Sequence, residues 1–385
     1  MHLLTLASLL PLALAAPVIQ SRSAQLIPNS YIVKLKDGSS NSALLNTING
    51  LESVNAKHVY RASKFKGFSA KLDAKALEKV KNLPEVEYIE QDAIITINTI
   101  VTQADVPWGL ARISSHTPNA ASYVYDDSAG AGTCAYIIDT GIYTNHSQFE
   151  GRATWLANFA GDGQNSDGNG HGTHVAGTIG GATYGVAKKT KLFAVKVLNA
   201  GGSGTLSGVI AGIDYVAADS ATRNCPNGSV ANLSLGGSKS TAINAAAAAA
   251  IRAGVFLAVA AGNSDDDASF YSPASEPTVC TVGASDDTDT RAWFSNYGTG
   301  VDVFAPGVDV LSSWIGGTTA TNIISGTSMA TPHIAGLGAY LLSFLGPKTP
   351  EVLCTYIRDT ATQGVITDLP SGTVNALAFN GNPAA

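Results

Sequence analysis

Short apolar runs bounded by turn residues recur through the second part of the chain, and they alternate with segments of helical spacing. The runs span residues 135–138, 192–198, 230–235, 255–260 and 280–283. Runs of this kind are typical of buried parallel strands. Strands that alternate with helices predict an α/β fold, here a doubly wound, mainly parallel sheet flanked by helices. In such a fold the functional residues lie at the carboxyl ends of the strands.

Two of the intervening segments predict helices. In the first, apolar residues recur at helical spacing at Leu206, Val209, Ile210, Ile213 and Val216. The second is the alanine run at residues 245–250. Because alanine is the best helix former and alanine-rich helices pack close to sheets, we expect a scaffold helix there.

A smaller unit precedes this pattern. Residues 31–36 alternate as a strand and are followed by the turn Asp37-Gly38. Residues 74–83 have helical spacing, and residues 86–89 predict another strand. We therefore assign residues 16–100 to a small α+β domain and residues 101–385 to the larger α/β domain.

The N-terminus has the pattern of a secretory signal. Residues 3–16 are apolar in character and uncharged, and Ala13-Leu14-Ala15 provides a small-x-small cleavage site. The run is too short to cross a bilayer, and every later apolar stretch of spanning length is interrupted by Gly or polar residues. We interpret residues 1–15 as a signal peptide and expect a secreted, extracellular protein without a membrane partner.

Charge divides the chain in the same place. Residues 17–100 carry 11 Lys+Arg against 8 Asp+Glu, a balance of +3, and residues 101–385 carry 12 against 21, a balance of −9. A basic domain would be attracted to an acidic one, although balances this small are equally consistent with unrelated surfaces. No basic stripe with interleaved aromatic residues occurs, so we expect no nucleic-acid partner.

The chain contains four cysteines, Cys134, Cys225, Cys280 and Cys354. An even number in an exported protein predicts disulfides, and four cysteines allow three pairings. Neither a CxxC motif nor a Cys/His spacing suited to zinc is present, so a zinc site is disfavoured.

Three Gly-flanked segments carry the residues of an acyl-transfer site. They are Ile138-Asp139-Thr140-Gly141, His171-Gly172-Thr173-His174 and Gly326-Thr327-Ser328-Met329-Ala330. Such a site needs a hydroxyl nucleophile, an imidazole that takes its proton, and a carboxylate that orients the imidazole. Each residue also has a structural interpretation, because Asp139 could cap a strand end and Ser328 could cap a helix. The zinc-protease motif His-Glu-x-x-His is absent from the histidine segment.

The order Asp, His, Ser is that of subtilisins, and the chain resembles subtilisin-type serine peptidases of the secreted proteinase K branch. Further matching segments are residues 107–110, 234–237, 260–263, 271–274 and 294–298. The resemblance implies that Ser328 is the nucleophile, His171 the base and Asp139 its orienting carboxylate. It places His171 in the turn before a helix and gives His174 a structural role. Ser328 opens a helix that continues through Pro332 to about residue 345.

An oxyanion hole and substrate edges follow from the same segments. The N–H of Ser328 lies at a helix start, and the side chain of Asn263 can supply a second donor. Substrate is expected to bind as an added strand between two edges, with a specificity pocket of small apolar walls beside them. The edges are Gly202, Ser203, Gly204 and Ser234, Leu235, Gly236, and the resemblance places Ala260, Ala261 and Gly262 in the pocket wall. Small uncharged walls favour aromatic or aliphatic residues before the cleaved bond, with broad specificity.

The resemblance also implies accessory features. Residues 16–100 correspond to an inhibitory and chaperone prodomain, whose tail at residues 94–100 could lie in the cleft, with the mature chain beginning near Val101. The family pairs Cys134 with Cys225 and Cys280 with Cys354. One structural calcium site is expected at Pro277, Val279 and Asp302, which offer hard oxygen ligands. The weaker family site lacks its aspartate, because Val365 stands there and Asp368 is three residues away.

Sequons occur at Asn145, Asn227 and Asn232. We expect glycosylation at the first two and discount Asn232, which lies in a predicted buried strand. The acidic run at residues 265–267 is interpreted as a solvated loop rather than a cation site.

Together these features predict a secreted serine endopeptidase that is made as a zymogen, acts on proteins and peptides, and is inhibited by its own prodomain. We expect a monomer without a catalytic cofactor. Two alternatives are a catalytically silent binding protein of the same fold and an esterase, since the same acyl chemistry handles activated esters.

Overall fold

The structure, a computed structural model, describes residues 15–19, 25–51, 55–62, 64–94 and 99–382. The predicted signal peptide therefore lies almost entirely outside the described residues. The chain divides into two compact units, Met1–Ile97 and Asn98–Ala385. Among the described helices, none combines the length and apolar character needed to cross a membrane.

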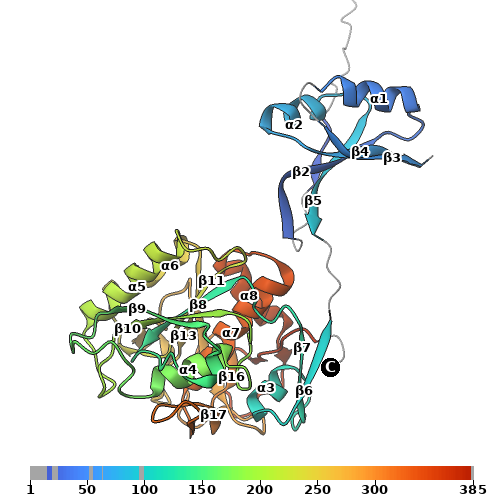
Figure 1. Ribbon diagram of the computed structural model, residues 1–385. Helices are drawn as coiled ribbons and strands as arrows, with labels where there is room; N and C mark the ends of the chain where they lie inside the picture. Colours follow the sequence, from blue (N-terminus) through green and yellow to red (C-terminus); the bar gives the residue numbers. More distant parts are fainter. Residues whose placement is uncertain (1–14, 20–24, 52–54, 63, 95–98, 383–385) are drawn as a thin grey trace, which may run out of the picture. The chain divides into compact units, whose positions relative to one another are not determined.

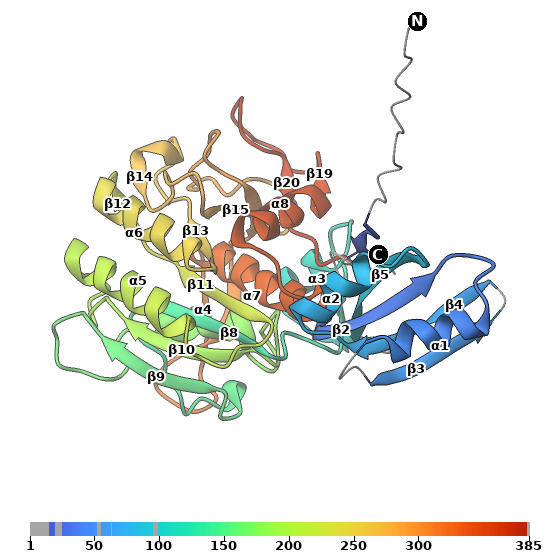
Figure 2. The same ribbon diagram turned by 90° about the horizontal axis from the view of Figure 1, so that it is seen from above.

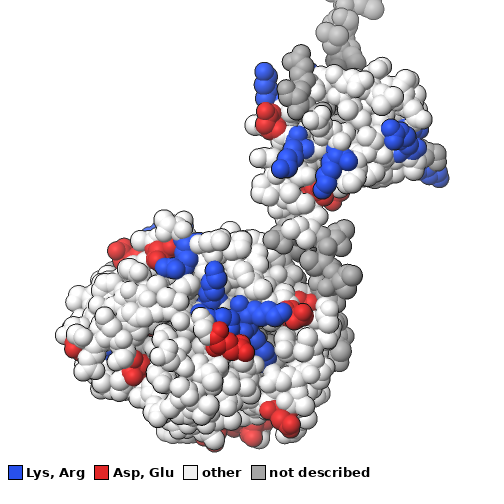
Figure 3. Space-filling view, in the orientation of Figure 1, with Lys and Arg blue, Asp and Glu red and all other residues white. Residues whose placement is uncertain are grey.

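The first unit is a five-stranded sheet with two helices on one face (Figures 1 and 2). Its elements are β1 (Val18–Ile19), β2 (Gln25–Leu35), α1 (Asn41–Asn49), β3 (Ala56–Ala62), β4 (Phe65–Lys71), α2 (Ala74–Lys81) and β5 (Val86–Ile94), and the strand order is β1-β5-β2-β4-β3. Val33, Phe68 and Ile89 are fully buried in its core. The predicted strands, turn and helix of this unit are all confirmed. Basic side chains are scattered over the face of the unit that Figure 3 shows, with few acidic ones among them.

The second unit is built on a nine-stranded sheet in the order β19-β20-β16-β15-β13-β11-β8-β10-β9. The strands β8 (Thr133–Asp139), β9 (Ala153–Asn158), β10 (Lys191–Lys196), β11 (Gly228–Leu233), β13 (Val255–Ala260), β15 (Cys280–Ser285), β16 (Val303–Pro306) and β20 (Ala376–Leu377) are parallel, and β19 (Thr362–Gln363) is antiparallel. All five predicted strands are present, although β10 and β11 each end two residues early. The chain leaves β8 toward one edge and returns to the other side at β11. This reversal is a topological switch point, where such sheets bind ligands.

Helices cover both faces of the sheet, as the alternation predicted (Figure 1). On one face, α5 (Leu206–Ser220) and α6 (Thr241–Arg252) pack against side chains such as Tyr136 and Ile138. On the other, α4 (His171–Gly180) and α7 (Thr327–Leu345) pack against Ala135 and Ile137. Because successive residues of β8 point to opposite faces, this single strand contributes to both cores. The helices α3 (Trp108–Ile113) and α8 (Pro350–Thr360) complete the second unit.

Small elements that the sequence pattern did not predict lie around the sheet. They are the paired strands β6 (Ile100–Ala104) and β7 (Ser122–Asp126), β12 (Gly237–Ser238) and β14 (Tyr271–Ser272), β17 (Val310–Ser313) and β18 (Thr321–Ile324), and the short helices η1 (Ser147–Phe149) and η2 (Ala268–Phe270). Each of these elements is only a few residues long or pairs with a single strand, so the sequence contains no long periodic pattern that would predict it.

Covalent and ionic links hold distant segments of the second unit together. Cys134 is bonded to Cys225 and Cys280 to Cys354, the two pairs that the resemblance implied. Arg112 of α3 is fully buried and binds both carboxylate oxygens of Asp289, at 2.7 and 3.0 Å. These links join residues that lie 74 to 177 positions apart in the sequence.

Candidate active site

Asp139 and His171 form a hydrogen-bonded pair at the carboxyl end of β8. Asp139 is fully buried at the last position of the strand. Its two oxygens lie 2.8 and 3.0 Å from Nδ1 of His171. Its Oδ1 also accepts the N–H of Thr140 at 2.7 Å. This arrangement fixes the orientation of the ring and leaves Nε2 free to take a proton.

The histidine is the first residue of α4, so its expected place in the turn before the helix is wrong by one position. Gly170 makes this start possible: its φ is +105°, and a Cβ there would lie 2.6 Å from the Trp314 ring. Burial lowers the pKa of His171, but the charge and hydrogen bond of Asp139 and the charge of Asp167 outweigh it and hold the pKa above its usual value. His174 is fully buried, and burial lowers its pKa to about 4.

Ser328 is the second residue of α7, which continues through Pro332 to Leu345 as predicted. Its hydroxyl donates to the carbonyl of Ser234 at 3.2 Å, and the hydroxyl of Ser234 donates to the carbonyl of Ser328 at 2.7 Å. These two bonds join the nucleophile candidate directly to a predicted substrate edge. Among the described contacts, the Ser328 hydroxyl is bonded to Ser234 and not to His171. Hydrogen bonds between a nucleophile and its base often align only when substrate binds.

Two donors converge on an open point beside Ser328. The amide oxygen of Asn263 accepts both the N–H and the hydroxyl of Thr327, each at 2.8 Å, and this fixes the orientation of the amide. The amide nitrogen of Asn263 and the backbone nitrogen of Ser328 each lie 3.6 Å from where a Cβ on Gly326 would stand. The missing side chain of Gly326 therefore leaves open space next to both nitrogen atoms.

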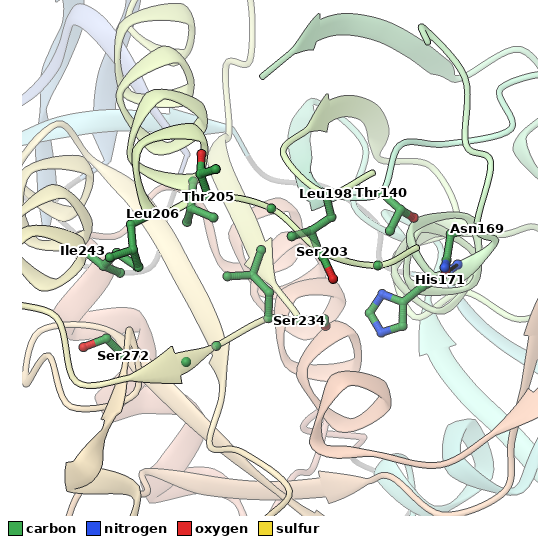
Figure 4. A pocket seen from close by; sticks show the side chains of 16 residues that line it. Thr140, Asn169, His171, Leu198, Ser203, Thr205, Leu206, Ser234, Ile243 and Ser272 are labelled. Carbon is green, nitrogen blue, oxygen red and sulfur yellow. Dashed lines mark hydrogen bonds between the residues drawn. The ribbon is translucent and has the colours of Figure 1, made fainter. Parts of the chain in front are cut away.

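A cleft of about 480 Å³ runs away from His171. The predicted edges, Gly202 to Gly204 and Ser234 to Gly236, both line it. Figure 4 shows His171 at one end, Ser203 and Ser234 facing each other across the middle, and Leu206 and Ile243 at the other end. At the far end, Leu206 and Ile243 of α5 and α6 supply apolar side chains, and Thr205 and Ser272 add two hydroxyls.

The predicted pocket wall lies beside the oxyanion donors rather than in this cleft. The carbonyl of Ala261 accepts the side-chain amide of Asn296, the N–H of Gly262 donates to the Thr327 hydroxyl at 3.3 Å, and Ala260 is buried. Asn296 and Thr327 therefore hold the wall, and sequence reasoning assigned neither of them a role. The matching segment at residues 294–298 was the available signal for Asn296.

Residues 130–379 match the family described as Subtilase, peptidase family S8. The chain belongs to the Subtilase family. Residues 30–98 match the Peptidase inhibitor I9 family. The order of the two matches, inhibitor before peptidase, is that of a zymogen.

Close relatives cover the whole chain. The subtilisin-like serine protease AsES of Sarocladium strictum is 56% identical over 100% of both chains. The cuticle-degrading protease of Metarhizium anisopliae is 55% identical over 99% of this chain and 100% of its own. A crystal structure of a cold adapted subtilisin-like serine proteinase is 45% identical, with a TM-score of 0.68 over 72% of this chain and 99% of that chain. This subtilase is a serine endopeptidase made with an I9 propeptide.

Asp302, one of the expected calcium ligands of the subtilase, lies beside the Cys280–Cys354 disulfide. Its carboxyl group is partly buried, and desolvation raises its pKa to about 6, while it accepts the N–H of Thr281 at 2.8 Å. Its carboxylate and the two sulfurs lie within 4.8 Å of one another, but disulfide sulfurs are not metal ligands. The Asp302 carboxylate is then the one hard oxygen donor in this described group. Subtilisin-like folds generally bind structural calcium.

The acidic run has partners within the protein. Asp265 pairs with Arg291 at 2.8 Å, Asp266 accepts the hydroxyl of Tyr271 at 3.2 Å, and Asp267 caps η2. Each of the three carboxylates thus has a partner within the protein.

The sequons differ in their surroundings. Asn145 is exposed in a turn. The side-chain nitrogen of Asn227 is part-buried and donates to the carbonyl of Ala131 at 2.8 Å. Asn232 is fully buried, as predicted, and donates to Ser234. Asn145 is therefore the more accessible of the two expected glycosylation sites.

Proposed function

We propose that Asp139, His171 and Ser328 form the catalytic triad of this endopeptidase, with Asn263 and the N–H of Ser328 as its oxyanion hole. The observation that carries the proposal is the paired contact of the buried Asp139 with His171, at the mouth of a cleft whose edge is bonded to Ser328. No other described histidine contacts a carboxylate in this cleft.

The geometry supports acyl transfer in two steps. The Ser328 oxygen attacks the substrate carbonyl while Nε2 of His171 takes the hydroxyl proton, and the carbonyl oxygen becomes an anion between the two donors near Gly326. Collapse breaks the C–N bond, and the imidazolium returns the proton to the leaving amine. Water then attacks the acyl-Ser328, again with His171 as base, and releases the acid product. Asp139 holds the tautomer and stabilises the imidazolium throughout.

Substrate binds as an extended strand between residues 202–204 and 234–236, where backbone hydrogen bonds give affinity with little sequence choice. The wall at residues 260–262 accepts an apolar or aromatic residue before the scissile bond. The apolar end of the cleft at Leu206 and Ile243 accepts a second apolar residue farther along the acyl side. Broad specificity with an apolar preference follows.

Hydrolysis of a protein and of a matched activated ester separates this function from its alternatives. A denatured protein substrate should be cleaved at internal sites, with fluorophosphonate abolishing that activity. Ester hydrolysis without internal cleavage of proteins would indicate an esterase. Binding of the protein substrate with no turnover of either substrate would indicate a silent binding protein.

The oxyanion donors give the first quantitative prediction. Asn263→Ala should lower kcat by about 10²–10³ with KM little changed, the loss found for the corresponding donor in another subtilisin. Asn244→Ala is a matched control. Asn244 lies on α6, its side-chain amide donates to the Ser275 hydroxyl, and it does not line the cleft. A loss confined to KM in the Asn263 variant would contradict the oxyanion assignment.

Residues 16–100 act as the inhibitor and folding guide of the peptidase, with cleavage near Val101. Of the expected tail at residues 94–100, residues 95–98 lie outside the described residues. Ile100 and Val101 lie in β6, paired with Asp126 and Tyr125 of β7. The peptide bond before Val101 must therefore separate from β7 before it can reach Ser328. We infer that cleavage takes place before β6 pairs with β7, or after this pair has opened.

We further propose that the protein is secreted, acts as a monomer and is glycosylated at Asn145.

Calcium stabilises the folded peptidase by binding the oxygens of Pro277, Val279 and Asp302. Because calcium binds only the folded state, chelation should lower Tm while the triad stays intact. Titration calorimetry of the decalcified mature enzyme should show one tight site that Asp302→Ala removes. Unchanged binding in that variant, or two comparable sites in the wild type, would contradict this assignment.

A further inference from the structure

Asp167 is a buried carboxylate in the loop that leads into α4, and it is 8% exposed. It accepts five hydrogen bonds. Its Oδ1 accepts the hydroxyl of Thr140 at 2.9 Å and the N–H groups of Asn169 and Gly170 at 3.0 and 2.9 Å. Its Oδ2 accepts the N–H and the hydroxyl of Thr173 at 3.0 and 2.6 Å. Every partner is an uncharged donor, either a backbone N–H or a threonine hydroxyl.

These partners come from the two segments that carry Asp139 and His171. Thr140 follows Asp139 directly, and its hydroxyl also accepts the N–H of Gly172 at 2.9 Å. Thr173 lies in the first turn of α4, two residues after His171. One carboxylate therefore ties the turn after β8 to the first turn of α4. The two turns are close: a Cβ on Gly172 would lie 2.1 Å from the carbonyl oxygen of Gly141.

The charge of Asp167 also acts on His171. The groups that face this ring are Asp139 from β8, Asp167 from the preceding loop and His174 from α4 itself. His174 is neutral above about pH 4. Lys196 of β10 donates to the carbonyl of Thr140 at 2.9 Å, but it pairs with Asp162 at 3.2 Å. Asp167 is thus the second negative charge that favours the imidazolium.

We propose that Asp167 is a positioning residue for catalysis, which holds His171 against Asp139 through its five hydrogen bonds and stabilises the imidazolium through its charge. This inference rests on the proposed triad. It assigns two separable effects to one side chain. Its hydrogen bonds set the geometry of proton transfer, and its charge sets the pH at which His171 becomes an active base.

The variant Asp167→Asn removes the charge and places an NH₂ group among hydrogen-bond donors. With a short peptide substrate and active sites counted by fluorophosphonate, kcat should fall about tenfold to a hundredfold because the imidazole is displaced. The acid limb of kcat/KM, which reports the free enzyme, should move to lower pH. The shift should be on the order of half a pH unit or more, as expected for a charge several ångströms away.

The matched control is Asp286→Asn. Asp286 similarly accepts two backbone N–H groups and one hydroxyl, from Thr288 and Thr290, but it contacts neither triad segment. Its profile should coincide with that of the wild type. An Asp167→Asn enzyme with an unchanged acid limb would overturn the inference, while an inactive wild type would instead sink the proposed function.

If Asp167→Asn does not accumulate as mature enzyme, a second pair of variants tests the positioning role of Asp167. Thr173→Val removes the hydroxyl's bond to Asp167 and the bond that it accepts from the N–H of Tyr143, and it keeps the charge of position 167 unchanged. It should lower kcat about tenfold with KM and the acid limb unchanged, and Thr173→Ser should restore the rate. Equal kcat in Thr173→Val and the wild type would refute the positioning role.

Discussion

Ser328→Ala should abolish peptide hydrolysis and leave the chain as an unprocessed precursor. Loss of the nucleophile lowers kcat by about 10⁶ in another subtilase, with the residual rate coming from the oxyanion hole and binding. Here the same loss should also block maturation, because we attribute cleavage near Val101 to the chain's own triad. The measurement is the mass and N-terminal sequence of the protein made in a protease-deficient host.

Ser343→Ala is the matched control for this experiment. Ser343 lies on the same helix, α7, but its hydroxyl donates to the carbonyl of Ala131, far along the helix from Ser328. This variant should mature and retain activity. A clean mature N-terminus in Ser328→Ala, expressed alone, would show that another protease performs the processing.

Arg112→Ala should cause the largest loss of stability among single changes to ion pairs in the peptidase. Arg112 and Asp289 are 2% and 7% exposed and share a bidentate contact. Removing the arginine leaves a buried carboxylate without its cation, which costs about 3–5 kcal/mol. For a domain of this size, the fall in Tm should be about 10 °C. Fluorophosphonate-treated enzymes avoid self-digestion during the thermal scan.

Lys189→Ala provides the comparison for a surface pair. Lys189 and Asp127 lie 2.7 Å apart, but their side chains are about half exposed. Solvent screens such a pair, so its loss should cost at most about 1 kcal/mol. The double variant Arg112→Met with Asp289→Asn should recover part of the stability lost in Arg112→Ala, since no unpaired charge remains and asparagine tolerates the φ of +62° at position 289. If Arg112→Ala and Lys189→Ala lowered the Tm by the same amount, the claim that burial makes the Arg112–Asp289 pair more important would be refuted.

The sequence alone predicted a structural element correctly where its apolar periodicity and a candidate catalytic residue lie in the same segment. The strand that ends at Asp139 and the helix that starts beside Ser328 follow from apolar periodicity and helix-start rules, and both are present. The two disulfides could not be paired from spacing, because three pairings were open, and the resemblance supplied the correct one. Short pairs such as β6 with β7 escaped prediction because their stability comes from a partner distant in sequence.

The hydrogen bonds that hold the candidate site residues in place could not be predicted from the sequence either. Asp167 was assigned no role from the sequence, because its bond to Thr140 depends on how α4 meets the end of β8. The bonds between Ser328 and Ser234 join residues 94 positions apart. The amide of Asn227 meets the carbonyl of Ala131 only after folding, so a sequon alone could not reveal that its nitrogen is used.

The most direct test of the account is mass spectrometry of the mature enzyme before and after treatment with a fluorophosphonate. We expect one adduct, located on Ser328 in the peptide that contains Gly326 to Ala330, together with a mature N-terminus near Val101. Prior titration of His171 to its protonated form at low pH should slow labelling, because only the neutral imidazole activates the serine. An unlabelled Ser328 in a protein that still cleaves peptides, or an adduct on another residue, would contradict the proposed triad.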